Sequence, residues 1–330
     1  MKIERELLIE LAQREAERRA HSGDIVSGYI IGSVARGDPQ LGGTADIDLV
    51  LIHDQPPKVR REVVHLSPQV HIDIAHHDRE LYTRPSELRV HRWIGPAMCE
   101  PIFLYDPDHY FEWAQAGARG QFFRADHALA RAEAFLHHAR GASSLLPVTG
   151  RWLQIYLKAA LEGANSIACL TGFPAAGRRV TMELEAAAHE LGCEQVFEGF
   201  LSLLGAGALQ AWSIPELLSS WARAFDLAVR HTQHALLAPP RREYYLGAFQ
   251  HLAEEGQTQA ILWPLLRTWE ASMHTLASLG MDAEIHPQWE ALLEALRLSP
   301  DWHTHRQEQL KGFLDQNQAW IEAWAERHGA

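Results

Sequence analysis

The sequence predicts an α+β protein in which a small mixed-sheet domain is followed by an all-helical region. Short apolar segments with strand character recur up to about residue 105 and are separated by turn-forming residues. From about Gln121 the apolar residues recur at helical spacing and continue to do so to the end of the chain. We therefore expect two domains, 1–120 and 121–330, because 330 residues exceed what one compact core usually holds.

The N-terminal elements follow from hydrophobic periodicity and from the turn residues between them. An amphipathic helix is expected first, because apolar residues form one stripe among Glu and Arg. Two segments joined by Ser67-Pro68-Gln69 are typical of a hairpin. The expected elements are a helix at 3–20, strands at 28–32, 47–53, 62–66 and 70–76, a short helix at 85–97 and a strand at 102–105.

The second region is predicted to be helical throughout, and its breaks fall at glycine and proline residues. The doublet Pro239-Pro240 divides it near 238–242, so two helical bundles are an option. The expected helices are 122–140, 151–171, 181–191, 195–205, 214–237, 243–254, 257–279, 287–297 and 303–327.

Composition limits the function classes. The formal net charge of -12 argues against a general nucleic-acid partner, because such binders usually carry a basic excess. Three scattered cysteines without CxxC spacing are typical of reduced thiols. No stretch approaches the ~20 apolar residues of a spanning helix, and no signal peptide is apparent, so we expect a cytoplasmic protein without a membrane partner.

One motif carries chemistry. Gly32 and Ser33 follow a predicted strand, where glycine permits a tight turn and serine offers a hydroxyl and an amide to phosphate. Asp46 and Asp48 lie two residues apart on the next strand and so point to the same face. Two close carboxylates favour a cation between them, and Mg²⁺ prefers carboxylate and phosphate oxygens.

A third carboxylate, Asp73, interrupts an apolar strand at alternate spacing. If that strand lies beside the strand of Asp48, the three carboxylates converge on one site. Such a site suits two-metal phosphoryl or nucleotidyl transfer.

These residues resemble the signature of the DNA polymerase β-like nucleotidyltransferase superfamily, which is Gly-Ser, a spacer, Asp-x-Asp and a distal Asp. Over roughly residues 25–110 the sequence is most similar to the small bacterial branch of this superfamily, which includes aminoglycoside adenylyltransferases and minimal nucleotidyltransferases. The resemblance implies that Asp46, Asp48 and Asp73 bind two Mg²⁺ ions and that Gly32 and Ser33 bind the phosphates of ATP or another nucleoside triphosphate. One position departs from the family pattern: Ala45 stands directly before the first Asp, where members usually carry Ser or a similar polar residue.

Arg36, which closes the same turn, is a nucleotide-binding candidate, with plain solvation as its alternative. A polar stripe on the predicted helix 151–171 supplies two more candidates. Lys158 would neutralise the triphosphate and Glu162 would accept the proton of the acceptor hydroxyl. Similar roles occur in the aminoglycoside enzymes, although the order of Glu and Lys is reversed here. The alternative is a surface ion pair of Lys158 with Glu162.

The resulting expectation is an enzyme that transfers a nucleoside monophosphate, AMP from ATP, to a hydroxyl of a small-molecule acceptor, for which an aminoglycoside-like cation is one option. Two alternatives stay open: AMP transfer to a protein or a tRNA end, and a nucleotide-binding protein whose catalysis has decayed. A homodimer is also left open.

Overall fold

The computed structural model describes residues 3–21, 23–146, 150–282 and 285–330, and within it the chain forms two compact units. Unit 1 comprises Met1–Phe123 together with Ala238–His251. Unit 2 comprises Arg124–Leu237 and Leu252–Ala330. A short segment from the middle of the predicted helical region therefore belongs to the sheet unit, which the predicted boundary near residue 120 does not reveal.

Unit 1 is built on a five-stranded mixed sheet with the order β3-β4-β2-β1-β5. The strands β2 and β4 are parallel, and every other neighbouring pair is antiparallel. Strand β2 in the centre is apolar on both faces over its second half, which suits a position covered from both sides. The strands are β1 Ile25–Ile31, β2 Ala45–His53, β3 Arg61–Ser67, β4 Val70–Asp78 and β5 Ile102–Tyr105.

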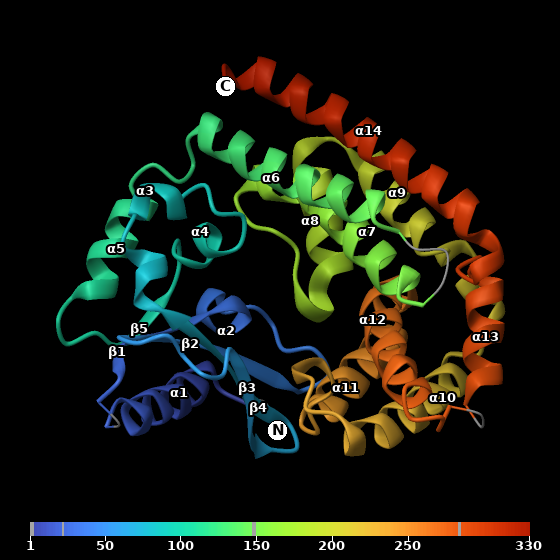
Figure 1. Ribbon diagram of the computed structural model, residues 1–330, viewed down its shortest axis with the longest axis horizontal. Coiled ribbons are helices and arrows are strands. Elements are labelled where there is room, and N and C mark those ends of the chain that lie inside the picture. Colours follow the sequence, from blue (N-terminus) through green and yellow to red (C-terminus); the bar gives the residue numbers. More distant parts are fainter. Residues whose placement is uncertain (1–2, 22, 147–149, 283–284) are drawn as a thin grey trace. The chain divides into compact units, whose positions relative to one another are not determined.

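Each face of this sheet is covered by helices (Figure 1). Helix α1, Arg5–Ala20, packs Leu8 and Ala12 against residues such as Leu49 on one face. The other face carries a cluster in which Tyr29 stacks on Phe111 with ring centroids 3.8 Å apart. The remaining helices of this part are α2 Gly32–Arg36, α3 Pro85–Leu88, α4 Ile94–Ala97, α5 Tyr110–Arg119 and α11 Arg241–Glu254, whose last turn passes into unit 2.

Unit 2 is helical. Helices α6 and α7 pack on each other, and the long C-terminal helix α14 runs along both (Figure 1). Helices α8 and α10 pack against α12. The helices are α6 Ala125–Ser144, α7 Trp152–Ala168, α8 Val180–Leu191, α9 Glu194–Leu203, α10 Ile214–Ala228, α12 Thr258–Ala277, α13 His286–Ala295 and α14 His303–His328.

The predicted α+β class is confirmed, and two predicted helices differ in detail. The segment 85–97 forms two short helices, because the imidazole of His91 accepts the backbone N–H groups of Trp93 and Ile94 and so starts α4 separately. The helix predicted at 214–237 ends at Ala228, since Thr232 is extended and accepts the N–H of His234 through its hydroxyl.

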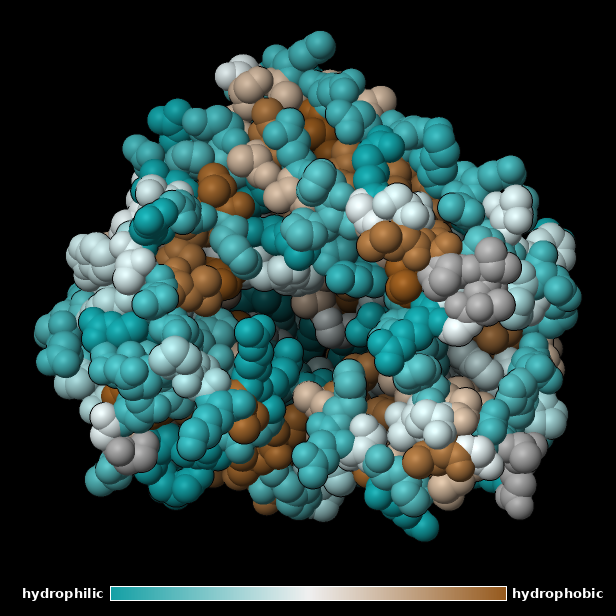
Figure 2. Space-filling view, in the orientation of Figure 1, coloured by the Kyte–Doolittle hydropathy of each residue, from teal (hydrophilic) through white to brown (hydrophobic). Residues whose placement is uncertain are grey.

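The visible face in Figure 2 is mostly hydrophilic, with apolar residues in small separate groups. Among the described residues no helix combines the length and the apolar character needed to cross a membrane.

Candidate functional site

The three predicted carboxylates lie on two neighbouring strands of unit 1. Strands β2 and β4 pair in parallel, with Asp48 opposite Asp73 and Asp46 opposite His71. Residues paired across a ladder point to the same face, and residues two apart on one strand do so as well. Asp46, Asp48 and Asp73 therefore share one face of the sheet, as the sequence pattern predicts if these strands are neighbours.

The turn after β1 brings backbone next to Asp48. Ile31, the last residue of β1, pairs with Asp48, and Gly32 follows it with a φ of 73°. A Cβ on Gly32 would lie 2.3 Å from Oδ2 of Asp48. Only glycine therefore lets the carboxylate occupy this position beside the turn. Half-buried Ser33 comes next, and within the described part of the chain its hydroxyl makes no hydrogen bond.

Asp48 has an unusual electrostatic environment. Burial raises its pKa to about 7, and the negative charge of Asp46 acts in the same direction. Three guanidinium groups lower the pKa in opposition, those of Arg61, Arg241 and Arg36. A divalent cation shared by the two carboxylates would relieve their repulsion, and hard oxygen donors suit Mg²⁺. The donor set at Asp46 and Asp48 therefore fits this ion.

Asp73, which the sequence predicts to be a metal ligand, is paired with two arginines. Its side chain is 1% exposed and accepts two hydrogen bonds from Arg61, from Nε to Oδ1 at 2.6 Å and from Nη2 to Oδ2 at 2.8 Å. Arg241 also pairs with Oδ2 through its Nη2. Both carboxylate oxygens are thus engaged by guanidinium groups. Asp73 fits a metal only after an arginine has moved.

Arg241 comes from α11, whose part within unit 1 packs beside the strands that carry the site. A Cβ on Gly42 would lie 1.9 Å from the carbonyl oxygen of Gly247, so the two backbones are in direct contact. The ring of Tyr244 meets His71 edge-on at a centroid distance of 5.1 Å. These contacts fix the helix that carries Arg241.

Arg36 lies at the end of α2 and pairs with Asp38, with Nη2 2.7 Å from Oδ2. Gly37 follows with a φ of 76° and closes the turn by donating its N–H to the carbonyls of Ser33 and Val34. Arg36 thus has a local structural partner, and its charge also lowers the pKa of Asp48.

Lys158 and Glu162 belong to α7 in unit 2, a different compact unit from the one that holds the aspartates. Lys158 is exposed, whereas Glu162 is only 5% exposed. No ion pair joins them among the described residues, so the alternative interpretation, a surface pair of Lys158 with Glu162, does not describe this structure. Further along, the side-chain amide of Asn165 exchanges two hydrogen bonds with the backbone of Ala175, so this end of the polar stripe is structural.

Glu270 on α12 is a second acidic candidate in unit 2, one that the sequence pattern does not single out. Burial raises its pKa to about 7, while Arg267 and Arg151 lower it. A carboxyl that titrates near neutral pH suits proton transfer, although structural groups also show such shifts.

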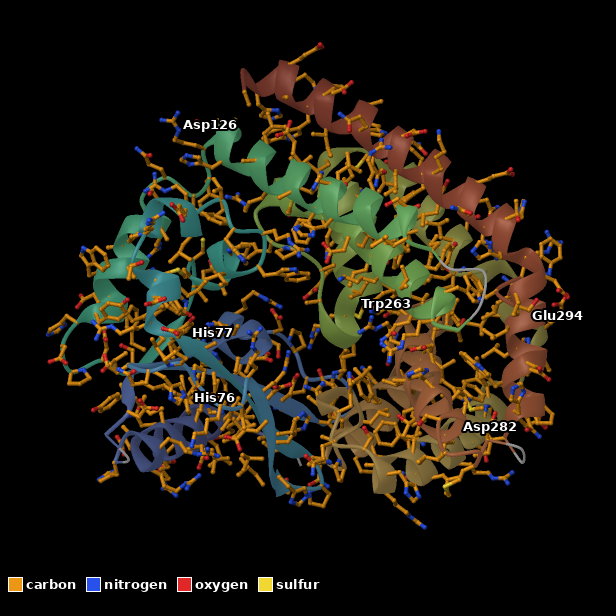
Figure 3. The ribbon with its side chains drawn as sticks, in the orientation of Figure 1. His76, His77, Asp126, Trp263, Asp282 and Glu294 are labelled. Atoms are coloured by element: carbon orange, nitrogen blue, oxygen red, sulfur yellow. The ribbon has the colours of Figure 1, made fainter. Side chains whose placement is uncertain are left out.

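Histidines of β2 and β4 form a separate polar chain on the α1 side of the sheet. His53 Nε2 lies 2.8 Å from Nδ1 of His76, and each ring contacts a carboxylate through its other nitrogen, Asp24 for His53 and Glu62 for His76. Figure 3 labels His76 and the adjacent His77 on β4. Among the described residues no group of three or more His, Cys, Asp or Glu side chains is arranged as a metal site.

The sequence pattern singles out Gly32, Ser33 and the three aspartates but does not indicate Arg61 and Arg241, the two arginines that contact Asp73. The local signal for Arg61 is weak: it directly precedes the strand predicted at 62–66, and the observed β3 begins one residue earlier, at Arg61 itself. Arg241 gives none, because its partner lies on a strand far earlier in the chain.

A comparison of the chain with protein-family models finds no matching family, and a search among curated proteins likewise finds no match.

Proposed function

We propose that the chain is a Mg²⁺-dependent nucleotidyltransferase that transfers AMP from ATP to a hydroxyl of a small-molecule acceptor. The observation that supports this most strongly is the grouping of Asp46, Asp48 and Asp73 on one face, with the Gly32 turn directly beside Asp48. That grouping combines a cation-binding carboxylate pair with a close backbone approach, and phosphoryl transfer needs both.

Different residues would bind the cation, the phosphates and the proton of the acceptor hydroxyl. Asp46 and Asp48 would hold the cation, and the backbone and hydroxyl of Ser33 would receive a phosphate of the nucleotide. When bound, Mg²⁺ would neutralise phosphate oxygens and make the α-phosphorus more electrophilic. The acceptor oxygen forms a bond to that phosphorus, the bond to the bridging oxygen breaks, and pyrophosphate leaves with the electron pair. Glu162 stays the predicted acceptor of the hydroxyl proton, and Lys158 a predicted phosphate ligand.

The test is transfer of label from α-³²P-ATP in the presence of Mg²⁺ and a panel of hydroxyl acceptors that includes aminocyclitols. Label should appear in an acceptor and pyrophosphate should be released. Asp48→Asn should abolish both, because it removes one carboxylate charge. Asp54→Asn is the matched control, since Asp54 follows the end of β2 but is exposed, and its side chain pairs with only Arg79 and Gln55 among the described residues. Absence of label and of pyrophosphate with every acceptor would refute the proposal.

One observation favours a second candidate, a nucleotide-binding protein with reduced catalysis. Asp73 is saturated by Arg61 and Arg241, so the third carboxylate is not open to a metal. Nucleotide binding that persists without Mg²⁺ and survives Asp48→Asn, together with no transfer, would support this candidate over the enzyme.

A further inference from the structure

The two arginines on Asp73 differ in how firmly they are held. The Arg61 side chain is 52% exposed and extends from β3, a strand at the edge of the sheet. The Arg241 side chain is 9% exposed and also donates from Nη1 to the hydroxyl of Tyr245 at 3.3 Å. Arg61 can therefore swing into solvent, whereas Arg241 cannot leave unless α11 separates from the sheet.

The oxygens of Asp73 are also shared unequally. Oδ1 accepts its hydrogen bond from Arg61, while Oδ2 accepts from both Arg61 and Arg241. Departure of Arg61 would free Oδ1 toward the face that carries Asp46 and Asp48, and Arg241 would still neutralise the buried charge. A buried carboxylate that loses every partner is strongly destabilised, so this retained pair makes the exchange feasible.

The charge balance explains why Arg61 would leave. Arg61 and Arg241 both act on Asp48, so the cluster holds positive charge close to where a cation would bind. A dication entering at Asp46 and Asp48 would repel the guanidinium that can move. The triphosphate that accompanies it offers planar pairs of oxygens, for which a guanidinium is a good bidentate donor.

We propose that Arg61 caps Asp73 in the absence of substrate and transfers to the triphosphate of the nucleotide when a divalent cation binds, while Arg241 stays in place as a positioning residue. This inference rests on the proposed nucleotidyltransferase function, since it assigns the triphosphate ligand of that same site. No covalent bond changes in the exchange. One guanidinium–carboxylate pair is replaced by a guanidinium–phosphate pair.

The test uses the full chain and two binding measurements that do not depend on turnover. Mn²⁺ alone, followed by electron paramagnetic resonance, reports the cation site. The Mg²⁺ complex of α,β-methylene-ATP, followed by calorimetry, reports nucleotide binding without transfer. The central variant is Arg61→Met, which keeps the apolar stem and removes the charge. Arg60→Met is the matched control, because Arg60 precedes β3, is exposed and has no ion pair among the described residues.

Arg61→Met should bind Mn²⁺ about tenfold more tightly, because removal of one charge near a dication changes the binding energy by an amount of this order in a hydrated site. The same variant should bind the nucleotide complex about tenfold more weakly, since a charge-assisted bidentate contact is lost. Arg61→Lys should restore part of the nucleotide affinity, because it keeps the charge without the fork. Arg60→Met should leave both affinities unchanged within about twofold.

Opposite changes in the two affinities support the exchange. Weakening of both in folded Arg61→Met, or no change in either, would overturn it, and tighter Mn²⁺ binding with unchanged nucleotide affinity would refute the triphosphate role. If the wild-type chain binds neither Mn²⁺ nor the nucleotide complex, the proposed function fails and the exchange fails with it. Should Arg61→Met not fold, Arg61→Lys decides alone: unchanged nucleotide affinity in that variant would refute the proposal.

Discussion

The contact between Gly32 and Asp48 gives the sharpest test of the cation site. A Cβ at position 32 would lie 2.3 Å from Oδ2 and 3.2 Å from Cγ of Asp48, closer than packed atoms approach. In Gly32→Ala the carboxylate must therefore rotate away from the turn. Gly43→Ala is the matched control, because Gly43 also has positive φ, 64°, but an added Cβ there meets nothing within 4 Å.

The expected magnitudes distinguish a loss of folding stability from a loss of cation affinity. Each alanine is forced into left-handed backbone, which costs about 1 kcal/mol, so both variants should lose a similar part of the free energy of unfolding. Only Gly32→Ala should also lose affinity for divalent cations. Removal of an outer-shell partner already weakens metal binding by about 10–100-fold, and displacement of a ligand should be at least as severe.

The assay is Mn²⁺ titration by electron paramagnetic resonance, with urea unfolding of both variants in parallel. Wild-type protein and Gly43→Ala should bind alike, and Gly32→Ala should bind at least tenfold more weakly at equal stability. Wild-type affinity in Gly32→Ala would show that Asp48 is not a cation ligand and would remove the main support for the proposed function.

Three further outcomes are expected. Gly42→Ala places a Cβ 1.9 Å from the carbonyl oxygen of Gly247 and should lower the free energy of unfolding by about 1–3 kcal/mol more than an alanine in open space; equal urea curves for this variant and the open-space control would contradict the contact. Burial lowers the pKa of His77, which contacts the Tyr82 hydroxyl, to about 4, so its neutral form stabilises the fold above the unfolded pKa and this stability is lost as pH falls toward 4. His77→Gln should therefore flatten the fall in unfolding free energy between pH 7 and 4, by up to ~3 kcal/mol, and an unchanged slope would refute the assignment. Burial raises the pKa of Glu270 to about 7, so the stability that its neutral form gives below the unfolded pKa is lost as pH rises through 7. The free energy of unfolding of Glu270→Gln should match that of wild type at pH 4 and exceed it at pH 8 by up to ~3 kcal/mol, less any solvent screening. Identical unfolding curves for the two proteins at both pH values would contradict the shift.

The local pattern of apolar and polar residues was sufficient to predict much of the sheet unit. Alternation of apolar and polar residues predicts β2 and β4, and the spacing of Asp46 and Asp48 places both on one face whatever the partner strand. The convergence with Asp73 needed one condition, that the two strands are neighbours, and their parallel pairing meets it. Glycine at position 32 signalled a close backbone approach, and the group that approaches is Asp48.

The partners of Asp73 could not be predicted in the same way. The chain has 30 Lys and Arg residues, and local periodicity does not indicate which of them meets a given carboxylate. Arg241 reaches Asp73 through the docking of α11, which depends on tertiary contacts such as that of Gly42 with Gly247. For the same reason the stripe on α7 showed which residues are polar but not which of them are buried. Glu162 is buried, although its spacing suits a surface position.

The assignment of Ala238–His251 to unit 1 has a consequence for synthesis of the chain. A ribosome releases residues in order, so the five strands emerge long before the segment that carries Arg241. Until residue 251 has emerged, Asp73 lacks its buried partner, and the face that α11 covers stays open to other contacts. Residues 124–237 meanwhile emerge and can begin to form helices. The sheet unit is therefore first to begin folding but cannot be completed until more than half of the helical unit has been made.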